Sequence, residues 1–494
     1  MQGTNLSKRC VTIVGGGNAG LICALVLRRA FPDYEITVIK SDKIGTIGVG
    51  EGSTEHWLNF MHYIDVPVSE LLIATLGTHK KGIRFEGWTE HTPDFFHASS
   101  SLPDNAPFIS NFNAAYAKLL ANGLLFTDNI TPMGIRENKV HAVYPHRSVN
   151  QFHFDTQELN DFFISKAKNR RISFIEGEVE KVDVSDDWIG SIELKNGTKV
   201  TSDFWIDASG FNRVLMSSLS GEKWNSFGKY LLTDSAIAFR TPPDESGEIR
   251  PYTRARALSS GWAWEIPTQI ERGNGYVYSS QHCTEEEAVS EMEGLLDIQI
   301  SDYKHFKFDP GYLENPWVGN CAAIGLAYSF VEPLEATSIG TTIHQSLALV
   351  SPLASFRKGN HWVAKEYNQT FKRVMLNILD MIRLHYVSDR EDSEFWVDMK
   401  EMPIPDSLEH LLGVWSERPP VDSDVATQWA LFGFPHFYYV GQGQGVINRK
   451  AAQESIDALG LNDATDRFLW DLRESRNAQP LKDHAETLKE LTKD

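Results

Sequence analysis

The sequence is poor in cysteine and in basic residues, and it contains no long apolar run. Only four cysteines occur in 494 residues, at positions 10, 23, 283 and 321, and none forms a CxxC pair. This spacing provides neither a zinc site nor a disulfide framework, so we expect no metal and a reducing, cytoplasmic location. The 47 basic residues stand against 66 acidic ones, a net charge of −19 that repels nucleic acid.

Membrane and export signals are missing as well. No stretch of about 18 apolar residues is present, and the N-terminal region has no cleavage site. We therefore expect a protein that is neither exported nor inserted in a membrane. The 41% hydrophobic content is enough to bury a large core, and it leaves open whether the chain forms a homo-oligomer.

The first 40 residues predict a nucleotide-binding βαβ unit. A β-branched run at 10–14 ends in a glycine-rich turn at 15–20, a helical pattern follows to residue 29, and a second apolar run occupies 35–39. Crossover handedness then predicts a parallel sheet. Alternating segments near 172–184, 190–206 and 231–241 predict a second sheet beside it, and helical spacing prevails from residue 341. We expect an α/β module over 1–340 and a mainly helical region over 341–494.

The turn at 15–20 fits the GxGxxG pattern, with Gly15, Gly17 and Gly20 at the glycine positions and Asn18 and Ala19 between the last two. In such a turn, backbone N–H groups at a helix start bind a pyrophosphate. The alternative is a turn chosen only for tight packing of strand against helix. The second strand ends in Lys40, where an acidic residue usually binds ribose. Lys40 can either form a local salt bridge or favour a phosphate.

Two later segments strengthen the prediction of a dinucleotide. A second glycine cluster follows the βαβ unit, where backbone has to pass close to a cofactor, and a strand with Asp207 near its end returns the chain to the dinucleotide. Together the three segments favour FAD over NAD, on a Rossmann-like fold of the flavin monooxygenase type. The cofactor-binding candidates of the second cluster are Gly48, Val49, Gly50, Glu51, Gly52 and Ser53.

Residues 261–267 read GWAWEIP and resemble the WxWxIP signature of flavin-dependent halogenases, the tryptophan halogenase family. The resemblance implies that Trp262 and Trp264 lie near the flavin and keep an organic substrate away from it. A strand with alternating tryptophans is the alternative. The block THKKGIRFEGW at 78–88 is similar to the family segment around an essential lysine, which implies that role for Lys80. Lys81 is adjacent, and His79 stands where phenylalanine is usual.

Residues 325–340 resemble the family segment that reaches the flavin, binds halide and supplies a carboxylate. The resemblance implies a catalytic role for Glu335 and a halide site at Thr337 and Ser338, with Ala336 where serine is common. It also implies that Gly325 and Phe330 bind the cofactor and that Pro333 lies near the flavin. A carboxylate stabilised by a helix dipole is the alternative for Glu335. Residues 366–396 match a helical scaffold block of the same family.

The activity implied by the resemblance is halogenation of an electron-rich aromatic molecule of the indole or phenol type. The reaction uses FAD as FADH2, oxygen and a halide such as chloride or bromide. Hypohalous acid made at the flavin is delivered to Lys80, which hydrogen-bonds it or becomes a haloamine, and Glu335 polarises that species or takes the ring proton. A separate NAD(P)H-dependent flavin reductase supplies FADH2. The alternatives are an FAD-dependent aromatic monooxygenase and a flavin-binding protein without turnover.

Overall fold

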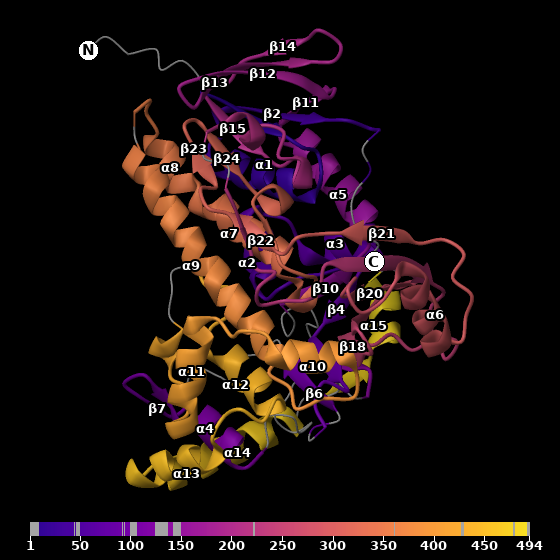
Figure 1. Cartoon of the computed structure of the whole chain (residues 1–494), viewed down its shortest axis with the longest axis vertical. Helices are drawn as coiled ribbons and strands as arrows, with labels where there is room; N and C mark the ends of the chain where they lie inside the picture. Colours follow the sequence, from indigo (N-terminus) through magenta and orange to yellow (C-terminus); the bar gives the residue numbers. More distant parts are fainter. Residues whose placement is uncertain are drawn as a thin grey trace.

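The structure is a computed structural model, shown in Figure 1. It describes residues 9–43, 45, 50–90, 92, 94–98, 106–123, 137–141, 150–220, 223–359, 361–425, 429–477 and 480–491. None of the helices in these ranges is long and apolar enough to cross a membrane.

The nucleotide-binding sheet has six strands and confirms the predicted βαβ unit. β1 (Cys10–Val14) lies in the centre and pairs in parallel with β2 (Glu35–Lys40) and with β15 (Phe204–Asp207). The outer strands are β11 (Ser173–Glu176) beside β2, β24 (Cys321–Ala323) beside β15, and β23 (Trp317–Val318), which alone runs antiparallel. The parallel strands all end at the edge where α1 begins, which is where open α/β sheets bind ligands.

Helix α1 (Asn18–Ala30) is deeply buried next to this sheet. Its residues 20–27 are all buried, and Arg28 and Arg29 occupy the last turn, where positive charge complements the helix dipole. α5 (Thr156–Asn169) and α7 (Thr337–Ala348) pack against it. The three helices therefore bring segments far apart in sequence to the start of α1.

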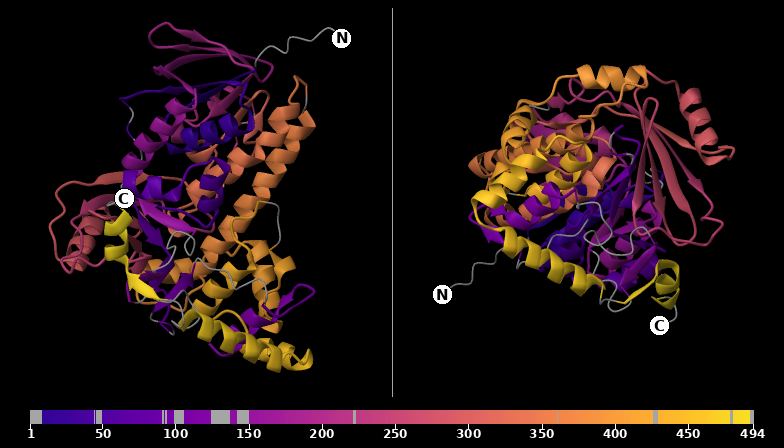
Figure 2. Two further views of the ribbon diagram at one scale, coloured as in Figure 1. Left: turned by 180° about the vertical axis from the view of Figure 1, so that it is seen from behind. Right: turned by 90° about the horizontal axis from the view of Figure 1, so that it is seen from below.

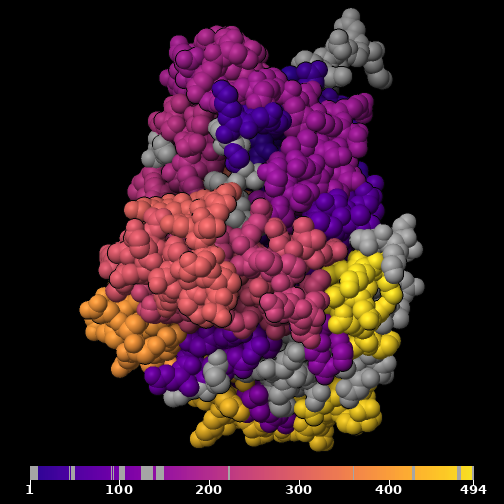
Figure 3. Space-filling view, turned by 90° about the vertical axis from the view of Figure 1, so that its right-hand side faces the viewer, coloured from indigo at the N-terminus to yellow at the C-terminus, as the bar shows by residue number. Residues whose placement is uncertain are grey.

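A second, larger sheet of seven strands lies next to the first layer (Figure 2). Its central strands are antiparallel, and β5 joins β18 in parallel. Helix α6 (Glu285–Leu296), which begins with a Thr284–Glu287 capping box, covers part of its outer face, and α6 and β21 fill the middle of the surface in Figure 3. In order across the sheet the strands are β21 (Lys304–Lys307), β17 (Ser235–Thr241), β20 (Arg272–Tyr278), β19 (Gly261–Pro267), β18 (Thr253–Leu258), β5 (Gly82–Glu86) and β6 (Asp94–Ala98).

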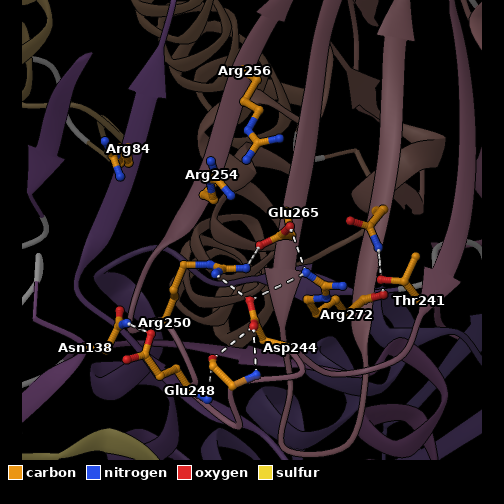
Figure 4. A network of polar contacts seen from close by, with 12 residues as sticks. Arg84, Asn138, Thr241, Asp244, Glu248, Arg250, Arg254, Arg256, Glu265 and Arg272 are labelled. Carbon is orange, nitrogen blue, oxygen red and sulfur yellow. Dashed lines mark hydrogen bonds and ion pairs between the residues drawn. The ribbon is translucent and has the colours of Figure 1, made fainter. Parts of the chain in front are cut away.

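An ion-pair network crosses the exposed part of this outer face (Figure 4). Glu86 of β5 accepts from Arg254 and Arg256 of β18, each at 2.9 Å. Glu265 of β19 lies between Arg250 and Arg272, as Figure 4 shows. Because β5 follows directly after the strand that carries Lys80, these charge-assisted hydrogen bonds help to fix that strand in place.

The remaining strands of the described residues form small sheets of two or three strands. β4 (Thr78–Lys80) and β3 (Glu51–Gly52) flank β10 (Gln151–Phe154), and β26 (Leu481–Asp483) pairs with β9 (Lys139–His141). The C-terminal segment thereby reaches the back of β4, where His484 Nε2 lies 3.3 Å from the backbone nitrogen of His79. The other small sheets are β12 (Val179–Ser185) with β13 (Trp188–Leu194) and β14 (Lys199–Val200), β16 (Trp224–Ser226) with β22 (Gly311–Leu313) and β25 (Ser329–Phe330), and β7 (Phe108–Ile109) with β8 (Phe112–Asn113).

The C-terminal part is helical as predicted, with β26 as the strand that interrupts it in the described residues. The long helix α9 (His361–His385) runs from the nucleotide-binding layer down to the helices at the bottom of Figure 1. The others are α8 (Val350–Ser355), α10 (Glu394–Glu401), α11 (Asp406–Glu417), α12 (Phe434–Gly443), α13 (Arg449–Ala458), α14 (Asn462–Asn477) and α15 (His484–Leu491), and the earlier α2 (His56–Tyr63), α3 (Val68–Ala74) and α4 (Ala114–Ala121) complete the set.

One expectation about the middle of the chain is wrong. The three alternating segments do not share a second sheet, because β11 and β15 join the nucleotide-binding sheet and β12 and β13 form a separate sheet with β14. Of the strands in these segments, β17 alone belongs to the large sheet. The alternation shows that a strand has one buried face, but it carries no information about which strand it pairs with. The division at residue 340 falls inside α7, which packs on α1.

Candidate active site

The glycines of the turn at 15–20 differ in how closely the protein packs around them. A Cβ atom on Gly15 (φ +124°) would lie 2.1 Å from the carbonyl oxygen of Ala208, and one on Gly20 would lie 2.0 Å from the carbonyl oxygen of Gly15. Gly17 differs, since a Cβ there would have no heavy atom within 4 Å. The outer glycines are therefore needed for packing, whereas Gly17 leaves open space at the start of α1, as the pyrophosphate of a dinucleotide requires.

Other predicted cofactor residues surround this turn. Asn18 accepts a hydrogen bond from Asn160, whose amide also donates to the carbonyl of Gly16 at 3.0 Å. Gly325 (φ +58°) packs on Ala19, where a Cβ on the glycine would come within 2.6 Å of the alanine Cβ. Segments from α5 and from the 3₁₀ turn Gly325–Ala327 thus converge on the start of α1.

Lys40 and Asp207 are both occupied by protein groups. Lys40 forms an ion pair with Asp42 and, at 3.7 Å, with Glu176. Of the two roles considered for Lys40, the structure therefore has the salt bridge. Asp207 is fully buried, and its carboxylate accepts from Ser209 and from the backbone N–H groups of Leu215 and Met216. Asp207 therefore orders the loop after β15, and direct contact of either side chain with the cofactor stays a prediction.

The second glycine cluster leads from the nucleotide-binding layer to Lys80. Gly48 and Val49 lie outside the described residues, and Gly50 packs on Gly273 and Ile266 of the large sheet. Burial raises the pKa of Glu51 to about 7, and Asp155 adds to this effect. A Cβ on Gly52 would lie 3.2 Å from Lys80 Nζ, and the carbonyl of Ser53 accepts a hydrogen bond from that ammonium at 2.9 Å. This segment thus positions Lys80.

Lys80 lies at the end of β4 and is almost fully buried. Burial lowers its pKa to about 8, an effect that the nearby negative charge of Glu335 opposes. Its neighbour Lys81 is equally buried, but its backbone N–H donates to the carbonyl of Pro251, on the side of the large sheet. The Lys80 ammonium thus contacts the glycine cluster, whereas the backbone of Lys81 is bonded to the large-sheet side.

Glu335 is held in a strained backbone conformation. Both Glu335 (φ 66°) and Ala336 (φ 54°) are left-handed, a conformation that costs about 1–3 kcal/mol for each non-glycine residue and is typical of functional sites. Its Oε1 atom lies 2.8 Å from His97 Nδ1 and 3.0 Å from His385 Nε2. Although burial opposes ionisation, these two imidazoles hold the pKa of Glu335 well below its usual range.

Lys80 and Glu335 line the same cavity, of about 20 Å³, together with Glu55, His97, Gln151 and His436. Apolar surface comes from Ile83, Leu431 and Phe432. This volume is far below the roughly 300–1,000 Å³ of ordinary ligand sites, so an aromatic ring can enter only if lining side chains move. A cavity of about 930 Å³ lies elsewhere, beside Trp188, Phe356 and Lys358, and contains neither predicted catalytic residue.

The tryptophans of the 261–267 segment point into the core between the sheets. Trp262 Nε1 donates to Glu332 at 3.1 Å, and the Trp264 indole covers Gly275, where a Cβ would come within 2.1 Å of the ring. Pro333 begins the turn that leads to Glu335. Phe330 packs edge-on against Phe211 and Phe308. The proximity of Trp262, Trp264, Pro333 and Phe330 to the flavin stays a prediction.

Thr337 and Ser338 are the first two residues of α7. Thr337 is buried, and the carbonyls of both residues accept hydrogen bonds from hydroxyls one turn later, those of Thr341 and Thr342. Free N–H groups at a helix start can bind an anion. This position is compatible with the predicted halide site, which stays a prediction.

Comparison with known proteins shows the family of this chain. The model of the tryptophan halogenase family matches residues 10–459. The chain belongs to the tryptophan halogenase family. Tryptophan 6-halogenase SttH from Streptomyces toxytricini is 30% identical over 92% of each chain. The structure of Xcc4156, a flavin-dependent halogenase from Xanthomonas campestris, is similar with a TM-score of 0.86 and 29% identity, covering 98% of each chain.

The fold resemblance extends to more distant relatives. A tryptophan halogenase from Shewanella frigidimarina has a TM-score of 0.90 at 23% identity, covering 98% of each chain, which supports the fold alone. The family assignment confirms a flavin-dependent halogenase with FADH2, oxygen and halide as co-substrates, and it favours halogenation of an aromatic substrate over the monooxygenase alternative.

Three histidines and one glutamate near Glu335 are residues that the sequence did not single out. His385 was part of a segment assigned to scaffold, and His97, His436 and Glu55 lie in segments without a diagnostic motif. All four come from elements distant in the chain. A buried glutamate in a turn with two left-handed residues is the structural signal that leads to them.

Proposed function

We propose that Lys80 and Glu335 act as an acid–base pair on hypohalous acid and an electron-rich aromatic ring, of the indole or phenol type. The observation that supports this most is that an ammonium and a carboxylate, both buried, line one small cavity. Neither residue belongs to the elements around Gly17, where FAD would bind. The oxidant would therefore be made in one place and used in another.

FAD would be held by the backbone of Gly15 to Gly20 at the start of α1, with Gly325 and the segment Gly50 to Ser53 nearby. Thr337 and Ser338 would hold the halide. When bound in its reduced form, FAD supplies the electrons that, with oxygen and halide, yield hypohalous acid. A separate NAD(P)H-dependent flavin reductase would provide that reduced cofactor.

The ring carbon forms its bond to the halogen as the halogen–oxygen bond breaks, and the electron pair leaves with oxygen. The Lys80 ammonium hydrogen-bonds this oxygen and donates the proton that completes water. Glu335 takes the proton lost from the ring carbon, and its return to Lys80 restores both groups. A pKa of about 8 leaves Lys80 mostly protonated at neutral pH, which favours this step over a haloamine.

The test separates oxidant formation from oxidant use. In Lys80→Met, reduced flavin should still react with oxygen and halide at a nearly normal rate, but halogenated product should be lost, because free hypohalous acid escapes. Flavin reoxidation is followed by stopped flow and product by mass spectrometry, with bromide and a panel of indoles and phenols.

Lys81→Met is the matched control, since it removes a neighbouring buried ammonium and keeps the side-chain volume. Product loss in Lys81→Met with product retained in Lys80→Met would move the assignment by one residue. Product in both variants would refute the role of a lysine.

A further inference from the structure

Four polar side chains form a continuous line from the cavity toward the surface. Glu335 Oε1 contacts His97 Nδ1 at 2.8 Å, His97 Nε2 contacts His436 Nδ1 at 2.8 Å, and His436 Nε2 contacts Glu55 Oε1 at 3.4 Å. The exposed fraction of the side chains rises along this line, from 4% and 5% for Glu335 and His97 to 13% and 29% for His436 and Glu55. The line therefore couples a buried carboxylate to one that reaches water.

The chemistry of the atoms fixes the direction of the two hydrogen bonds that end on a carboxylate. A carboxylate can only accept, so Nδ1 of His97 donates to Glu335 and Nε2 of His436 donates to Glu55. If His97 is neutral, its Nε2 carries a lone pair, which accepts from Nδ1–H of His436. His436 then donates from both nitrogens and is an imidazolium, whereas His97 is neutral.

The electrostatic surroundings agree with this pattern. Burial lowers the pKa of both histidines, but Glu55 outweighs it for His436, whose pKa is raised, while that of His97 stays lowered. His436 in turn overcomes the effect of burial on Glu55 and lowers its pKa to about 2. Other titratable groups that act on the line are Lys80 and His385 beside Glu335, His56 beside Glu55 and His436, and His344 beside Glu55.

We propose that His436, kept protonated by Glu55, is a positioning residue that acts on Glu335 through His97. By donating to Nε2 of His97, it turns the Nδ1–H of that ring toward Glu335, and its positive charge keeps the glutamate ionised and ready to take the ring proton. The inference rests on the proposed role of Glu335 as the base. It adds that the base depends on His436 and Glu55, which are hydrogen-bonded to Glu335 only through His97.

The first test measures protonation directly, on the full-length protein without cofactors. Long-range ¹H–¹⁵N NMR of histidine side chains, assigned with His97→Gln and His436→Phe, should show His436 protonated on both nitrogens at neutral pH and His97 on Nδ1 alone. Glu55→Gln should make His436 neutral at the same pH. A neutral His436 in the wild type, or no change in Glu55→Gln, would overturn the proposal.

The second test is the pH profile of halogenated product formed per flavin oxidised, a ratio that removes effects on oxidant formation. Glu335 works as a carboxylate, so activity falls as pH drops through its pKa. His436→Phe and Glu55→Gln should move this acidic limb to higher pH by about one unit, a tenfold change in proton affinity, with little change in KM. An equal loss at every pH would indicate a purely structural role and refute the proposal.

Two further variants complete the experiment. His282→Phe is the control. His282 pairs with Asp398 at 3.0 Å in the same way but lies outside the cavity, so the pH profile of this variant should match the wild type.

Glu335→Gln distinguishes the role proposed for Glu335 from the role proposed for His436 and Glu55. If it halogenates normally, the role of Glu335 itself fails; if it is inactive while Glu55→Gln and His436→Phe keep the wild-type profile, only the present proposal fails.

Discussion

The indole nitrogen of Trp262 donates a hydrogen bond to the buried carboxylate of Glu332 at 3.1 Å. The same carboxylate accepts from Thr233 at 2.5 Å and from Tyr386 at 3.0 Å. Because Tyr386 follows His385 at the end of α9, adjacent residues hold Glu332 and Glu335. Burial raises the pKa of Glu332 to about 6, and these donors oppose that effect.

Replacing Trp262 with phenylalanine should therefore reduce stability more than chemistry. The change removes one donor from a buried carboxylate, which costs roughly 1–3 kcal/mol of the free energy of unfolding. Thermal and urea unfolding measure this loss, and FAD affinity should be unchanged.

Trp264→Phe, which leaves Glu332 intact, should lower the halogenation rate modestly. Complete loss of activity in Trp264→Phe with normal folding and FAD binding would mean that this tryptophan has a chemical role.

Glu335→Gln should lose halogenated product by about 10²–10⁴-fold while oxidant is still made, because an amide cannot take the ring proton.

The same variant should change the pH dependence of the free energy of unfolding. The folded-state pKa of Glu335 is lowered, so its contribution to stability is present above the ordinary pKa of 4.5 and is lost as pH falls. The variant should be less stable than the wild type at neutral pH, and the difference should shrink in acid. Urea unfolding at several pH values checks this.

Lys80→Met should make the protein more stable at neutral pH. The folded-state pKa of about 8 lies below the ordinary 10.5, so folding disfavours the ammonium by roughly 3 kcal/mol when both states are protonated. The lost hydrogen bond to Ser53 offsets about 1 kcal/mol of this gain. The gain is full below pH 8 and disappears as pH rises to 10.5. A variant less stable than the wild type at pH 7 would contradict this, and the exposed Lys195→Met should show no such gain.

Local patterns predicted the parts of the fold that depend on neighbouring residues. The run of β-branched residues, the glycine turn and the apolar helix are consecutive in sequence, and they form β1, α1 and β2 as expected. The catalytic surroundings could not be predicted in this way. His97 lies 238 residues from Glu335, and His436 lies 339 residues from His97. Contacts at such separations depend on strand pairing and helix packing, which a single sequence does not specify.

Lys40 illustrates the same limit on a smaller scale. Its position at the end of β2 was evident from the sequence, but two roles were open, because a lysine there can meet an acid or a phosphate. The structure provides Asp42 from the following turn and Glu176 from β11, a strand more than 130 residues away. The pairing of β11 with β2 explains why Glu176 is the second partner of Lys40.

Substitutions in the glycine turn allow effects on folding and on cofactor binding to be measured separately. Gly17→Val should fold with nearly wild-type stability, because a Cβ at this position meets no heavy atom within 4 Å and the backbone there is extended, with φ −72° and ψ 175°. FAD affinity should nevertheless be lost, since the new side chain occupies the space at the helix start that the pyrophosphate needs.

Gly20→Val is the matched comparison, and it should disrupt folding, because its Cβ would lie 2.0 Å from the carbonyl oxygen of Gly15. Thermal unfolding measured with FAD titration by flavin fluorescence distinguishes the two variants. Normal FAD affinity in a folded Gly17→Val protein would show that the dinucleotide binds elsewhere.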